Sequence, residues 1–144
     1  MVAIIILTVG LLSLAQMIVL ATNSNTLSGR MTSTSSLAKE QLEKLKATPF
    51  YVDPLTKTRS AALADGGDLD SAAAGYVQDY DARGLPVAGN GFYEVRWQIR
   101  TVNANLPLEM VEIRVRCLST AGKGEQFAII GEARFTTYRT ANVG

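Results

Sequence analysis

Hydrophobic residues are unevenly spread along the chain, and the first part is apolar on every side. Residues 2–21 are interrupted only by Thr8, Gly10, Ser13 and Gln16. A helix of this length spans ~30 Å, about the thickness of the hydrocarbon core of a bilayer. The pattern predicts a membrane-spanning helix. A cleaved secretory signal is the main alternative, although such signals begin with basic residues and have a shorter apolar run.

The apolar pattern narrows to one stripe after residue 21 and continues as far as Pro49. Residues three or four positions apart share a helical face, and this stripe contains Leu27, Met31, Thr34, Ala38, Leu42 and Leu45. Proline pushes the residue before it out of the α region. We therefore expect one helix from Met1 to about Ala47, ~70 Å long. Its weak point is the stretch 22–36, whose Ser, Thr and Asn residues favour a break.

After the predicted helix, the pattern of hydrophobic and polar residues changes twice more. Residues 48–91 show no sustained periodicity and are expected to form a long connecting loop with at most one helical turn. From Phe92 onward apolar and polar residues alternate, which predicts three antiparallel strands joined by turns at 103–107 and 121–124, with Gly131 as a candidate bulge. The expected fold is α+β, with the helix covering a three- to four-stranded sheet. The predicted contacts between helix and sheet involve Leu37, Leu42, Leu45, Val95, Trp97 and Val115.

Charge and composition argue against several functions. The chain has 14 basic and 13 acidic residues, none of them before Arg30, and a net charge of +1. This balance provides no basic face for nucleic acid. Histidine is absent and Cys117 is the only cysteine, so the usual general base, an intrachain disulfide and a zinc motif are all missing. No catalytic residue, metal ligand or cofactor is predicted, and we expect the protein not to be an enzyme.

A few polar groups could still form sites. Asp65, Asp68 and Asp70 resemble a fragment of a calcium loop but lack its spacing and terminal glutamate, so a flexible acidic turn is the preferred interpretation. Trp97 is expected in the core, with a ligand platform as the alternative, and Cys117 as a buried thiol. On the exposed sheet face, pairing across strands could join Glu94, Arg96, Glu112 and Arg114.

The opening MVAIIILTVGLLSLAQ resembles the hydrophobic stretch that follows the processing site in type IV pilin-like proteins, specifically minor pilins of the PilV type. The segments FYEVRWQIR, VEIRVRCLS and FTTYRT resemble the sheet of the same group. On this alignment about six residues of a mature pilin would precede Met1.

The resemblance implies a pilin-like organisation and a structural role. Residues 1–29 would be a transmembrane and filament-core helix, and 30–144 a periplasmic domain made of helix 30–47, loop 48–91 and sheet 92–140. Such subunits wait in the inner membrane and are then assembled by the pilus machinery with other pilins into a surface filament. Close helix packing would use Gly10, Leu11, Leu14 and Ala15. A minor pseudopilin of a type II secretion system and a single-pass anchored binding domain remain alternatives.

Overall fold

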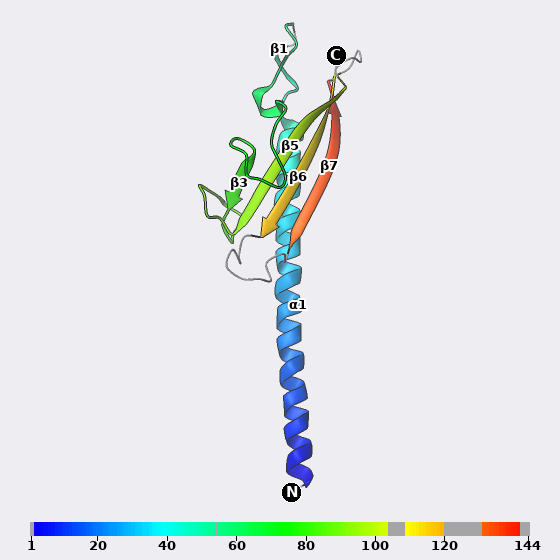
Figure 1. Ribbon diagram of the computed structural model, residues 1–144, viewed down its shortest axis with the longest axis vertical. Helices are drawn as coiled ribbons and strands as arrows, with labels where there is room; N and C mark the ends of the chain where they lie inside the picture. Colours follow the sequence, from blue (N-terminus) through cyan, green and yellow to red (C-terminus); the bar gives the residue numbers. More distant parts are fainter. Residues whose placement is uncertain (1, 54, 104–108, 120–130, 142–144) are drawn as a thin grey trace.

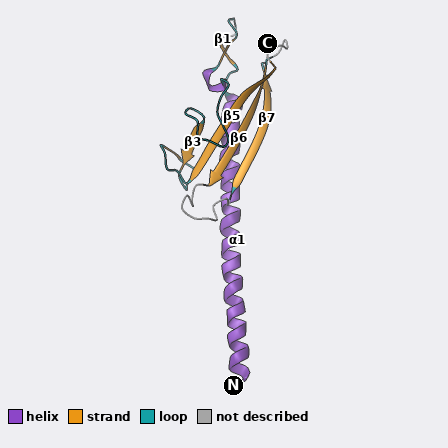
Figure 2. Cartoon of the chain, viewed as in Figure 1, coloured by secondary structure: helices purple, strands orange, loops and turns teal. Residues whose placement is uncertain are grey.

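The computed structural model describes residues 2–53, 55–103, 109–119 and 131–141. One long helix, α1 (Val2–Ala47), carries an antiparallel sheet against its C-terminal half, while its N-terminal half extends away from the sheet (Figure 1). The remaining strands are short: one pair lies beyond the C-terminal end of α1, and the others lie beside the long strands at one edge of the main sheet (Figure 2). The fold is α+β, as the sequence predicts.

Helix α1 runs without interruption for 46 residues, so the expected break within 22–36 does not occur. Hydroxyl groups in and before this stretch bond to the carbonyl oxygen four residues back, as in Thr22 to Ile18 (2.8 Å), Thr26 to Thr22 (3.0 Å) and Thr32 to Ser28 (2.9 Å). These bonds direct the hydroxyls to acceptors inside the helix. They therefore do not compete for the backbone N–H groups that maintain it.

The C-terminus of α1 is held by a side chain from the far end of the chain. Pro49 has no N–H, so the carbonyl of Leu45 lacks its usual intrahelical donor. The guanidinium of Arg139 supplies one instead, donating to Leu45 O (3.0 Å) and also to Thr48 O. Helix and sheet are thus joined by hydrogen bonds as well as by apolar packing.

The main sheet is antiparallel, in the order β4-β3-β5-β6-β7. Three of its strands are long: β5 (Tyr93–Asn103), β6 (Met110–Ser119) and β7 (Glu132–Thr140). The irregularity in register lies between Thr101 and Asn103. Gly131 shows no bulge, because the Ser119 N–H bonds to its carbonyl (3.2 Å) in the register that β6 and β7 already share. Asn103, the first residue of the turn predicted at 103–107, still belongs to β5. The rest of that turn, the turn predicted at 121–124 and the first residues of the third strand, which the sequence predicts over 126–140, lie outside the described residues.

Residues 48–91 form more structure than the connecting loop that the sequence predicts. Two strands, β3 (Val77–Tyr80) and β4 (Pro86–Val87), extend the main sheet to five strands rather than three or four. A separate ribbon is formed by β1 (Tyr51–Asp53) and β2 (Thr58–Arg59), followed by a 3₁₀ turn at Ala61–Leu63. Strands of two to four residues are too short to show a period of two, which is why the pattern did not reveal them.

The core lies between the second half of α1 and one face of the sheet. Leu37, Leu42 and Leu45 are buried, as are Val95 and Val115. Trp97 is only partly buried, at the margin of the core, where its ring packs against Tyr76 with centroids 6.3 Å apart. The reason is geometric: α1 packs mainly on β6 and β7 and makes fewer contacts with β5.

Candidate functional site

The N-terminal half of α1 is the largest apolar surface in the described part of the chain. Ten large hydrophobic side chains between Ile4 and Leu20 are 59–69% exposed. Soluble monomers rarely expose so continuous a patch, and a surface of this kind is compatible with a membrane anchor. By its length and composition alone, α1 is also long and apolar enough to cross a membrane.

Polar groups on this half of the helix are mostly satisfied within it. Thr8 donates to the carbonyl of Ile4 (2.7 Å), and Ser13 donates to that of Val9 (2.9 Å). Such bonds let hydroxyl groups enter an apolar phase without leaving a donor unpaired.

The residues predicted to pack against neighbouring helices all lie on this exposed half. Leu11 is 60% exposed and Leu14 is 59% exposed, while Gly10 and Ala15 are exposed beside them. A Cβ added at Gly10 would meet no atom within 4 Å. The glycine is therefore not required by the fold of its own chain. A Cβ at this position is free of contact with the rest of the domain.

The opposite face of the sheet, away from α1, carries paired charges. Arg96 pairs with Glu94 of β5, and Arg114 pairs with Glu112 of β6 (3.0 Å). These pairs run along a strand, two residues apart, whereas the sequence predicts pairing across strands. The two glutamates are also buried rather than exposed. Residues two apart on a strand share a face, which makes this pairing possible.

Glu112 illustrates the electrostatics of this face. Burial by itself would raise its pKa, but hydrogen bonds from Arg114 and Tyr138 outweigh that effect and hold the pKa below its usual value. The carboxylate is therefore ionised and engaged at neutral pH. A general base near pH 7 requires a raised pKa, and Glu112 does not have one.

Three arginines face each other directly across this surface. Arg96, Arg116 and Arg134 occupy matching positions of β5, β6 and β7. Like charges in register repel one another, and acidic groups beside them offset this. Arg116 pairs with Glu132 (2.9 Å) and with Asp70 (2.6 Å).

The acidic turn that resembles a calcium loop is bound to the protein at each carboxylate. Asp65 accepts hydrogen bonds from Thr101 (2.9 and 2.7 Å), and Asp70 pairs with Arg116. Asp68 accepts from the backbone N–H of Asp70 (3.0 Å) and so closes the turn. Within the described residues no group of three or more acidic, Cys or His side chains could hold a metal ion.

The turn passes close to the backbone of β5. A Cβ added at Gly67 would lie 2.1 Å from the Trp97 carbonyl oxygen, so this position requires glycine.

Cys117 lies in the core, and burial raises the pKa of its thiol to about 12. A thiol of this kind is protonated at neutral pH and is a poor nucleophile.

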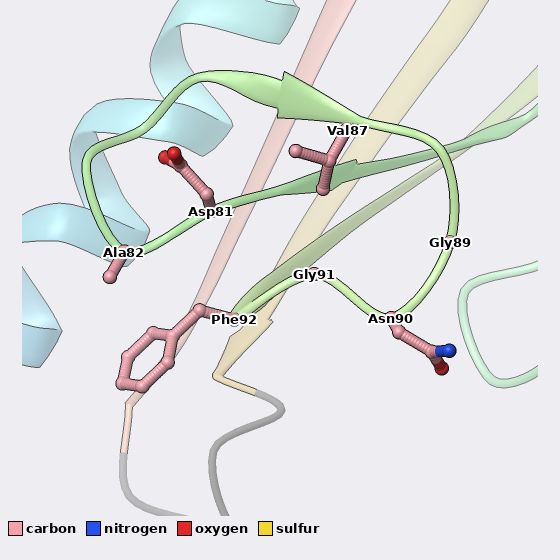
Figure 3. A pocket seen from close by; sticks show the side chains of 7 residues that line it. All are labelled: Asp81, Ala82, Val87, Gly89, Asn90, Gly91 and Phe92. Carbon is pink, nitrogen blue, oxygen red and sulfur yellow. The ribbon is translucent and has the colours of Figure 1, made fainter.

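An open hollow of about 460 Å³ lies beside the β3–β4 turn (Figure 3). Asp81 is its acidic residue, and the carboxylate accepts hydrogen bonds from the backbone N–H groups of Arg83 and Leu85 (2.8 Å each). Figure 3 shows the side chains of Asp81, Asn90 and Phe92 pointing in different directions. The hollow therefore offers no converging set of catalytic groups.

Sequence reasoning did not single out Arg139. Pro49 signals that Leu45 O needs a donor from elsewhere, but nothing in the local pattern identifies the donor. Comparisons with models of protein families, with curated proteins and with solved structures found no match to this chain. The proposal for its function therefore rests on the sequence and the geometry.

Proposed function

We propose that this chain is a structural, minor pilin-like subunit of a type IV pilus. The N-terminal helix would hold it in the inner membrane with the sheet domain in the periplasm, and the subunit would later join or prime the filament. The observation that carries the proposal is α1: one unbroken helix with an exposed apolar half and a half that carries the sheet.

Both halves of α1 fit this role. The apolar half is ~30 Å long and suits a bilayer before assembly. It also suits a filament core, in which apolar helices pack against one another through small residues. Because the helix continues into the domain without a hinge, the sheet keeps a fixed orientation relative to the helix.

A structural role also agrees with the polar groups. The sequence contains no histidine, and the buried carboxylates Glu94 and Glu112 are engaged with arginines. We therefore propose that the protein works by assembly and contact rather than by catalysis.

The test is a substitution that changes only the contact between this helix and a neighbouring helix. Gly10→Leu keeps the segment apolar, and a Cβ at this position meets no atom within 4 Å, so membrane insertion should persist. Close approach by another helix should be obstructed. We expect the variant to be recovered from membranes at wild-type amounts and to be depleted from filaments sheared from the cell surface.

Val9→Leu is the matched control, because it enlarges an adjacent side chain that is already large and 63% exposed. This variant should enter filaments normally. If the wild-type chain never appears in surface filaments, the pilus role is wrong. Recovery in a secretion filament would then favour a pseudopilin, and recovery in membranes alone an anchored binding domain.

A further inference from the structure

A second hollow, of about 390 Å³, lies between the end of α1, the segment 61–76 and β5. Its walls come from all three elements, and Trp97 and Tyr76 supply the aromatic part. Three small residues, Ala61, Ala62 and Gly75, also line it and leave its volume open. A pocket of this size with aromatic walls and a few polar groups is typical of small-molecule sites.

Gln41 contributes an amide to the wall of this hollow. Its side chain lies on the buried stripe of α1 and is only 9% exposed. Among the described residues no hydrogen bond to its amide is found, although the amide has two donor hydrogens and an acceptor oxygen. The amide lines the hollow and its atoms remain accessible to solvent, so they can donate to and accept from a ligand there.

The aromatic wall is fixed in position. Tyr76 donates its hydroxyl to the carbonyl of Ala64 (3.1 Å), which holds the ring against Trp97 at an interplanar angle of 56°. Trp97 lines the hollow, and its indole N–H, for which no hydrogen bond is found in the described part of the chain, is a further donor available to a ligand.

The charges around the hollow exclude an ionic ligand. Of the lining residues that the structure describes, Lys44 is the only charged one. Its ammonium is paired with Glu40 at 2.8 Å, and the bond to Glu40 raises the pKa of Lys44. Among the described lining residues the one ammonium is thus already paired, and none is a carboxylate that would attract a cation.

We propose that this hollow binds a neutral saccharide ring. One face of a pyranose carries C–H groups that can lie on the ring of Trp97. Neighbouring hydroxyls, each able to donate and to accept, match the free amide of Gln41 and the indole N–H. The site is formed within one chain and does not depend on the filament role, so either proposal can fail without the other.

Trp97 provides the assay, because it is the single tryptophan of the chain. The full chain is placed in lipid nanodiscs free of glycoside detergent, and its tryptophan emission is followed during titration with methyl glucopyranoside, methyl galactopyranoside, methyl mannopyranoside and N-acetylglucosamine. We expect a saturable change with at least one of these, with a dissociation constant of about 1 mM or lower. Sorbitol, a neutral polyol without a ring face, should give none. The proposal is overturned if no sugar gives a saturable change, or if sorbitol gives the same one.

Two variants test the site itself. Gln41→Leu should fold normally and weaken sugar binding about tenfold through the lost hydrogen bonds. Ala62→Phe, at an exposed position, should fill the hollow and abolish binding without touching the contacts between helix and sheet. Thr136→Ala, at an exposed position of β7 on the opposite face of the sheet, is the control and should bind as the wild type does. Wild-type affinity in both pocket variants would place the sugar elsewhere and refute the assignment.

Discussion

Arg139→Met tests whether the end of α1 depends on a side chain from the last strand. Methionine keeps the apolar part of the side chain but cannot donate a hydrogen bond. The carbonyls of Leu45 and Thr48 would then lose their donor, and Pro49 provides no N–H in its place. An acceptor left unsatisfied costs about 1–3 kcal/mol. The Arg139 side chain is partly accessible, so water can replace part of the lost hydrogen bonding to the two carbonyls. We therefore expect the free energy of unfolding to fall by about 2–3 kcal/mol in total.

The measurement is thermal unfolding of residues 30–144 followed by circular dichroism. For a domain of this size the expected loss lowers the melting temperature by about 10 °C. Arg134→Met is the matched control: the same substitution on the same strand, at a side chain that is 57% exposed and pairs with Glu132 on the other face. Exposed ion pairs contribute little, so this variant should melt close to the wild type. Equal melting temperatures for the two variants would refute the proposed role of Arg139.

Three further predictions concern the anchor, the core and the thiol. Removal of residues 1–29 should give a soluble fragment, because the exposed apolar half of α1 leaves with it; a fragment that remains in the membrane fraction on centrifugation would contradict the anchor. Leu42→Asp should destabilise that fragment by about 3 kcal/mol or more in urea titration, by burying an unpaired charge, whereas Lys39→Ala on the solvent side should leave it unchanged. Cys117 should resist thiol reagents at pH 8 until the protein is unfolded. Since burial raises its pKa from 9.0 to about 12, its contribution to stability is complete below pH 9 and should be lost as the pH rises towards 12, which unfolding curves at several pH values can check.

The parts of the fold that follow from sequence are those with long, regular patterns. The stripe through Leu42 and Leu45 predicts that α1 is amphipathic in its second half, and alternation from Tyr93 to Arg100 identifies which face of β5 is apolar. In both cases many residues repeat one period, so a single exception does not obscure the signal. The long helix and the antiparallel sheet are accordingly present where the pattern predicts them.

Features set by contacts between distant segments were not predictable in the same way. Alternation places Trp97 on the apolar face, but only the position of α1 over β6 and β7 determines that it lies at the margin. Likewise β3 is ordered by its pairing with β5, through Tyr80 opposite Tyr93, and not by any pattern of its own. The hollow beside Trp97 is a product of the same arrangement, since no local pattern brings Gln41 and Tyr76 together.

The polar residues of α1 follow one rule in two environments. The hydroxyls of Thr8 and Ser13 on the exposed half, and of Thr34 in the buried half, all donate to carbonyls of the helix itself. A short side chain can be satisfied in this way in lipid and in a protein core alike. The longer amides of Gln16 and Gln41 have no such bond in the described part of the chain, and an amide must also find a donor for its oxygen. Where α1 carries an amide on an apolar stripe, it therefore needs a partner from outside the helix, whereas a hydroxyl at the same place does not.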